Sequence, residues 1–313
     1  MATLKEAAGF ILKRLFKIRE KEKVLVVTDR IKEQLGKIFY NAAKNISLAS
    51  MMKIPVGKIH GQEPPKPAAN EMKKADVILL VTEKSLSHTE ARKKATAKGA
   101  RIASMPGITA GMLKRSVMVD YDKMYKTKQK IRNALRKAKT CRITTKKGTD
   151  ITFRIPKLKP KKKKYLDRKS SWDNLPSGEE YFAPSDANGI YVIDASVLDK
   201  KPDKPIKITV KKRYAVKIEG GRLAAELKNI LKKLRNKNSY NIAELGIGVN
   251  PKAKLTGNIL EDEKVLGTCH IALGSSFAIG GKIKAKCHLD GVIKNPTITA
   301  GKKVIMENGK LKI

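Results

Sequence analysis

Acidic and imidazole side chains gather in one stretch of this chain, residues 241–290, which holds two of its four histidines. Within it, His288 and Asp290 are two residues apart. Side chains with this spacing on a β-strand point to the same face, so the imidazole and the carboxylate can reach one ion together. Histidine nitrogen and carboxylate oxygen are both common ligands of divalent metals. The spacing therefore predicts a metal site in this stretch.

A second candidate ligand, Glu244, begins the run ELGIGV at residues 244–249. Apolar residues alternate there with Glu244 and two glycines, so one face of a strand can pack while the other carries a carboxylate beside bare backbone. Glycine lets a ligand or an ion approach the strand closely. Because a buried carboxylate needs a proton, a partner or a metal, we expect Glu244 to face a cation.

Four runs in the second half of the chain are distinctive: NLPSGEEYFAP, NIAELGIGVNP, ILEDEKVLGTCHIALG and CHLDGVIKNPT. In these runs, and in this order, the chain resembles the aminopeptidase T and aminopeptidase S family of dinuclear metallopeptidases. The resemblance implies two divalent ions (zinc, cobalt, manganese or magnesium), with Glu244 as the bridging ligand. The sequence leaves open whether Glu263 binds an ion, carries the catalytic proton, or does both. Its neighbours Glu261 and Asp262 are interpreted as a solvated turn. The complete set of implied ligands is Glu179, Glu244, Glu263, His270, His288 and Asp290.

This resemblance implies a metalloaminopeptidase, which hydrolyses the first bond of peptides with a free N-terminus through a water activated by two ions. One departure is Phe277, seven residues after His270, where the family usually has a tyrosine, so the hypothesis includes a lowered turnover. One alternative is a catalytically weakened scaffold that binds RNA or another polyanion. Another is a metal-dependent hydrolase of a different amide. The sequence is compatible with a homodimer.

The formal net charge of +40 raises a nucleic-acid hypothesis of its own. Lysine outnumbers arginine, however, and aromatic residues make up only 5% of the chain. The arginine forks and interleaved aromatic rings that are typical of base or phosphate readout are sparse. We therefore expect only weak, non-specific binding to polyanions.

The cysteines and the apolar runs bear on the compartment. Three cysteines without metal-finger spacing favour reduced thiols in a cytoplasmic protein. Cys269 and Cys287 each directly precede a proposed histidine ligand, so strand alternation predicts that both thiols point into the core. No apolar run is long enough to span a bilayer, and we expect no membrane partner.

The elements that must position these ligands fall into two predicted domains. Residues 1–139 alternate strands and helices with short connections, which predicts an α/β domain with a mainly parallel sheet. A long amphipathic helix at residues 121–139 ends this domain. No glycine-rich phosphate loop follows the first strand, residues 24–27, which argues against a nucleotide-binding domain. From residue 140 the apolar pattern changes to a period of two, which predicts a β-rich α+β domain, residues 140–313, that binds the metal.

Overall fold

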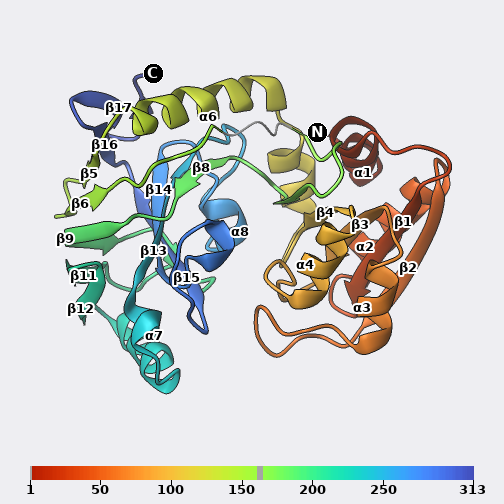
Figure 1. Cartoon of the computed structure of the whole chain (residues 1–313), viewed down its shortest axis with the longest axis horizontal. Helices are drawn as coiled ribbons and strands as arrows, with labels where there is room; N and C mark the ends of the chain where they lie inside the picture. Colours follow the sequence, from red (N-terminus) through yellow and green to blue (C-terminus); the bar gives the residue numbers. More distant parts are fainter. Residues whose placement is uncertain (1, 161–164) are drawn as a thin grey trace. The chain divides into compact units, whose positions relative to one another are not determined.

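The computed structural model describes residues 2–160 and 165–313, and the described chain divides into two compact units (Figure 1). Unit 1 comprises the described residues within Met1–Val119 and Lys163–Ser177. Unit 2 comprises those within Asp120–Lys162 and Gly178–Ile313. The long helix α6 (Tyr121–Arg136), which the sequence analysis placed at the end of the first domain, belongs to unit 2. All six proposed metal ligands lie in unit 2 as well.

Unit 1 is built on a five-stranded parallel sheet in the order β2-β1-β3-β4-β7. The central strand β3 has the sequence VILLV and is buried throughout, because both faces of the sheet are covered. The expected α/β domain with a mainly parallel sheet is confirmed. Its strands are β1 (Lys23–Asp29), β2 (Leu48–Ile54), β3 (Val77–Val81), β4 (Arg101–Ser104) and β7 (Trp172–Asn174). Its α-helices are α1 (Leu4–Phe10), α2 (Glu33–Lys44), α3 (Lys66–Met72), α4 (Glu90–Ala97) and α5 (Ala110–Met112).

The hydrophobic core under one face of this sheet shows why these elements form. Alternate residues of the strands point to that face, and small or flexible apolar side chains of α3 and α4 pack against them. The core residues from the strands are Leu25, Val27, Ile54, Ile78, Leu80 and Ile102, and those from the helices are Ala68, Met72, Ala91 and Ala95.

Unit 2 contains two antiparallel sheets. The larger has eight strands in the order β12-β11-β9-β6-β5-β16-β17-β18. In β5 and β6 buried and exposed residues alternate, as expected for a sheet with one face on the core. The strands are β5 (Thr140–Thr144), β6 (Asp150–Arg154), β9 (Asp186–Ile193), β11 (Ile206–Lys211), β12 (Tyr214–Glu219), β16 (Thr297–Ala300), β17 (Lys303–Glu307) and β18 (Lys310–Leu311).

The smaller sheet of unit 2 carries the chemistry, in the order β10-β15-β14-β13-β8. Its strands are β8 (Glu179–Phe182), β10 (Ser196–Val197), β13 (Ile242–Gly248), β14 (Thr268–Gly274) and β15 (His288–Lys294). Every residue of β13 and β14 is buried, so these strands form the centre of the unit. The α-helices of unit 2 are α6, α7 (Arg222–Lys233) and the single turn α8 (Ile259–Asp262), which lies in the connection between β13 and β14. The predicted β-rich α+β character is confirmed.

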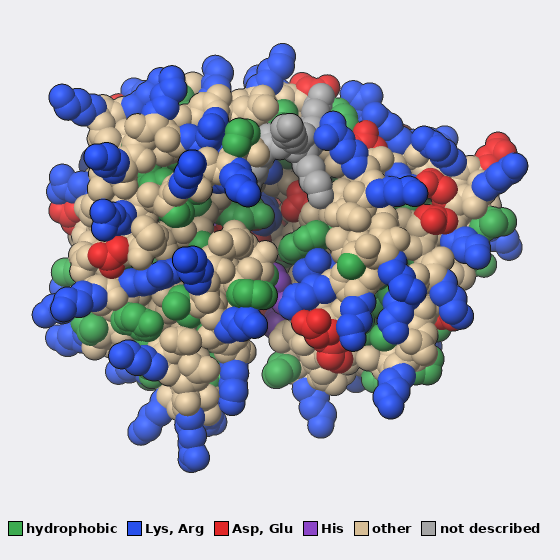
Figure 2. All heavy atoms as spheres, viewed as in Figure 1, with side chains coloured by type: hydrophobic (Ala, Val, Ile, Leu, Met, Phe, Trp, Pro, Cys, Tyr) green, Lys and Arg blue, Asp and Glu red, His purple; other side chains and the backbone are tan. Residues whose placement is uncertain are grey.

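The surface reflects the composition. On the face drawn in Figure 2, lysine and arginine side chains are scattered among other types and do not gather in one patch. Weak polyanion binding stays a prediction, and it would come from this diffuse positive charge. Among the described residues, no helix is both long enough and apolar enough to cross a membrane.

Candidate metal site

Four neighbouring strands of the smaller sheet carry five of the six proposed ligands. Glu179 lies on β8, Glu244 on β13, His270 on β14, and His288 and Asp290 on β15. The residues that pair with them on β13 and β14 are all glycine or alanine, so these positions place no bulky side chain between the ligands. Small residues leave space above the strands for an ion. The small residues at the pairing positions are Gly246, Gly248, Ala272 and Gly274.

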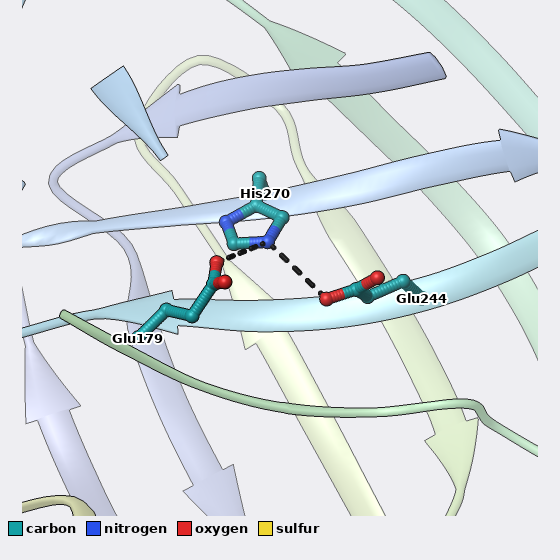
Figure 3. Close-up of side chains that lie close together, drawn as sticks. All are labelled: Glu179, Glu244 and His270. Carbon is teal, nitrogen blue, oxygen red and sulfur yellow. Dashed lines mark ion pairs between the residues drawn. The ribbon is translucent and has the colours of Figure 1, made fainter. Parts of the chain in front are cut away.

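The distances between these side chains are short. His270 Nε2 lies 3.2 Å from Glu179 Oε2 and 3.6 Å from Glu244 Oε1 (Figure 3). His288 Nε2 lies 3.2 Å from Glu244 Oε2 and 3.6 Å from Asp290 Oδ1. The Glu244 carboxylate thus presents one oxygen to each imidazole, and the expectation that it faces a metal cation stays a prediction.

Gly246 explains how His270 can lie so close to the backbone. A Cβ atom built on Gly246 would stand 2.1 Å from both Cε1 and Nε2 of the His270 ring. Any side chain at this position would therefore push the imidazole out of the site. The sequence analysis expected the glycines of this strand to admit a ligand or an ion, and at Gly246 the group admitted is the imidazole itself.

Glu263 reaches the cluster from a different element. It follows α8 directly, is buried, and offers a carboxylate oxygen within 4.8 Å of ligand atoms of His270 and Asp290. Its neighbours Glu261 and Asp262 are completely buried, so their interpretation as a solvated turn is wrong.

The two neighbouring carboxylates instead hold backbone groups of the preceding loop. Asp262 accepts hydrogen bonds from the N–H groups of Thr256 and Gly257, at 2.7 and 2.9 Å. Glu261 accepts one from the N–H of Lys254 at 3.2 Å. These bonds fix the turn that carries Glu263.

Several buried polar atoms of the cluster make no hydrogen bond and have only the ion-pair contacts given above, or none. Among the described residues these atoms are Glu179 Oε2, Asp290 Oδ1 and both ring nitrogens of His270. Buried polar atoms nearly always have a hydrogen-bond partner, so several without one in the same place require an explanation. A divalent cation would satisfy the carboxylate oxygens and one imidazole nitrogen at once, and the donor set therefore fits a metal ion. That these residues bind metal stays a prediction, as does the number of ions.

Lys264 is a member of the cluster that the sequence analysis missed. Its side chain is 1% exposed, and its ammonium lies 2.6 Å from Glu179 Oε1 and in direct contact with Glu263 Oε1. The signal was present in the run EDEK, where a lysine follows three acids in a segment that resembles a ligand motif. A lysine beside buried carboxylates is their nearest source of positive charge.

The proximity of opposite charges sets the protonation of the cluster. Burial alone would lower the pKa values of His270 and His288, but the neighbouring carboxylates outweigh it and hold both well above the ordinary value. Burial would raise the pKa of Glu179, yet the Lys264 ammonium and His270 hold it far below its usual range. Burial, reinforced by Glu179 and Asp290, raises the pKa of Glu263 to about 8 despite Lys264.

The two cysteines beside the histidines differ from each other. Cys269 is buried inside β14, as predicted, whereas Cys287 is only partly buried, so the prediction for Cys287 is wrong. Strand β15 begins at His288, and strand alternation therefore does not govern Cys287. Burial raises the pKa of both thiols.

Comparison with known proteins decides the family. The model of the NicX family, described as 2,5-dihydroxypyridine 5,6-dioxygenase, matches residues 12–313. The chain belongs to this dioxygenase family. A 2,5-dihydroxypyridine 5,6-dioxygenase of Pseudomonas putida is 26% identical over 191 residues, which are 56% of this chain and 55% of that relative. The matched stretch thus spans about half the length of the relative.

Two solved structures share the fold. The 2,5-dihydroxypyridine dioxygenase of Pseudomonas putida has a TM-score of 0.84 at 20% identity, over 98% of this chain and 96% of that one. AmpT from Thermus thermophilus has a TM-score of 0.74 at 13% identity, over 99% of both chains. At these identities the likeness is one of fold.

The family overturns the expected activity. The sequence analysis predicted an aminopeptidase that hydrolyses peptide bonds, and the dioxygenase family match contradicts that prediction. What remains of the aminopeptidase resemblance is the shared fold. The physical reason is that imidazoles and carboxylates on neighbouring strands are a ligand set for several metals, and a ligand set does not fix the reaction. The expected effect of Phe277 on peptidase turnover no longer applies.

Proposed function

We propose that this protein is an iron-dependent dioxygenase acting on a hydroxylated nitrogen-containing aromatic ring, with 2,5-dihydroxypyridine or a close analogue as substrate. One observation carries the proposal: in a chain of this family, His270, His288 and Asp290 lie on the adjacent strands β14 and β15. Two histidines and one carboxylate are the ligand set typical of non-haem Fe(II) oxygenases.

The family name indicates that both atoms of O₂ enter the ring, at positions 5 and 6. If each carbon receives one oxygen atom and the bond between them breaks, the ring itself supplies the electrons that reduce O₂. No separate reductant is then needed. Bound iron would supply the redox chemistry that allows O₂ to react with the ring, and His270, His288 and Asp290 would hold it.

The other residues of the cluster have roles in positioning and proton transfer. Ser275 fixes the orientation of His288, because its carbonyl oxygen lies 2.8 Å from Nδ1 of that ring. A ring hydroxyl becomes more electron-rich when it loses its proton, and Glu244, whose pKa the two imidazoles hold below its usual range, is a carboxylate that can accept it.

The proposal is tested by oxygen uptake. Protein loaded with Fe(II) without oxygen present should consume O₂ when 2,5-dihydroxypyridine is added, and Asp290→Asn should abolish the uptake. Asp150→Asn is the matched control, because Asp150 is an exposed carboxylate of the same unit that pairs with Arg142. Wild-type protein that contains iron but consumes no O₂ with this substrate would overturn the proposal.

A further inference from the structure

Lys264 occupies a place in the cluster that a metal ion could otherwise fill. Its ammonium lies 2.6 Å from Glu179 Oε1 and contacts Glu263 Oε1. The second oxygen of Glu179 faces His270 Nε2 at 3.2 Å. The ammonium and a divalent ion bound through Glu179 and Glu263 would therefore compete for the same oxygens.

The charges of the cluster lead to the same conclusion. Glu179, Glu244, Glu263 and Asp290 carry four negative charges when all are ionised. Two divalent ions would balance them, and so would one divalent ion together with the Lys264 ammonium and a single proton. Buried charges have to be balanced, because taking them out of water is expensive. Two divalent ions in addition to the buried ammonium would leave an excess of positive charge.

Lys264 is also held in place by its backbone. Its N–H donates to the carbonyl of Glu261 at 2.9 Å, and its carbonyl accepts from the N–H of Asn250 at 2.8 Å. Among the described residues it is the one lysine that is fully buried. A surface lysine can swing away from its partner, whereas this side chain is fixed at both its backbone and its ammonium.

We infer that the Lys264 ammonium serves as a built-in second cation, which limits the carboxylate cluster to one divalent ion. The inference rests on the proposed function only in taking the cluster to be a metal site, and it makes the single iron a consequence of one residue. Replacing Lys264 by a small neutral residue should open a second metal site at Glu179 and Glu263.

The experiment counts ions. Wild-type protein, Lys264→Ala and Lys264→Arg are each loaded with Mn²⁺, desalted and analysed for manganese per chain. We expect one ion in the wild type, two in Lys264→Ala, and one in Lys264→Arg, because arginine restores the charge. The electron paramagnetic resonance spectrum should change from that of an isolated Mn²⁺ to that of an exchange-coupled pair only in Lys264→Ala.

A matched control is Arg132→Met. Arg132 also forms an ion pair in unit 2 and is itself partly buried; its partner, the buried Glu180, lies 3.0 Å away and is the neighbour of Glu179 on β8. This variant should lose stability and still hold one ion. A second ion in Arg132→Met would show that any loss of buried positive charge admits metal, and would contradict the specific role of Lys264.

Two outcomes overturn the inference. One is a Lys264→Ala protein that still holds a single ion. The other is wild-type protein that binds two ions, which is measurable by titration even if Lys264→Ala does not fold. Since Mn²⁺ counting needs no substrate, these outcomes are separate from the oxygen-uptake test. Wild-type protein with one ion and no O₂ uptake would contradict the proposed function alone.

Discussion

His288 Nδ1 lies 2.8 Å from the backbone carbonyl oxygen of Ser275. A carbonyl oxygen only accepts hydrogen bonds, so Nδ1 must carry the proton of this contact. When the ring is neutral, Nε2 then holds the free electron pair, and it faces Glu244 and Asp290. A metal-binding histidine is typically oriented by such a bond from its other nitrogen. The contact therefore leaves Nε2 as the nitrogen that would bind an ion.

The first prediction concerns this imidazole. Losing an outer partner of a metal ligand weakens metal binding by roughly 10- to 100-fold. His288→Ala removes the proposed ligand itself, so it should weaken Mn²⁺ binding by more than that. Titration calorimetry measures the change. His60→Ala is the control, because that ring lies in unit 1 and accepts a hydrogen bond from the Ser85 N–H. Equal affinities in the two variants would remove His288 from the ligand set.

The second prediction concerns Gly246. In Gly246→Ala the new methyl group would stand 2.1 Å from the His270 ring, so the imidazole must move and metal binding should be lost. Gly9→Ala is the matched control, since nothing lies within 4 Å of a Cβ atom there. Metal content of the two purified variants decides the matter. A Gly246→Ala protein with normal metal content would show that His270 is not needed in its present place.

The fold was predictable from the sequence to a large extent, and for identifiable reasons. The continuous apolar run of β3 indicates a strand buried on both faces, which is typical of a parallel sheet. The alternation in β5 and β6 indicates strands buried on one face, which is typical of an antiparallel sheet. The two-residue spacing of His288 and Asp290 is enough to put both on one face of a strand.

The site was only partly predictable, because burial within connections leaves no periodic signal. Glu261, Asp262 and Lys264 lie in or beside a single helical turn, where neither strand nor helix spacing reveals which side chain points inward. The exposure of Cys287 depended on where β15 begins, and strand ends are the least certain feature of a sequence-based assignment. The reaction was beyond reach, since the same ligand types serve hydrolysis and oxygen chemistry.

The third prediction concerns pH. Because the pKa values of His270 and His288 are held well above 6.5, both rings keep their protons in the metal-free protein at neutral pH. Metal binding needs the neutral imidazole, so binding must release protons. Affinity should therefore rise as the pH rises and fall on acidification. Calorimetric titrations with Mn²⁺ in two buffers of different ionisation enthalpy count the protons, and identical heats in both buffers would contradict the prediction.

The fourth prediction concerns the thiols. Burial raises the pKa of Cys141 to about 12 and that of Cys269 well above its ordinary value, so neither should react with a thiol reagent in the native protein. Cys287 is partly exposed with a raised pKa, and it should react slowly. Cys287→Ser should remove this slow phase, while denaturation should expose all three thiols of the wild type. Rapid labelling of two thiols in the native protein would contradict this assignment.

The fifth prediction is the isotope experiment that tests the central claim most directly. Protein loaded with Fe(II) is supplied with 2,5-dihydroxypyridine under ¹⁸O₂ in ordinary water, and the product is analysed by mass spectrometry. The proposed function predicts a product heavier than the substrate by both labelled oxygen atoms, before any exchange with water. A product that carries oxygen only from water, or a protein that leaves this ring intact and hydrolyses amino-acid amides, would contradict it.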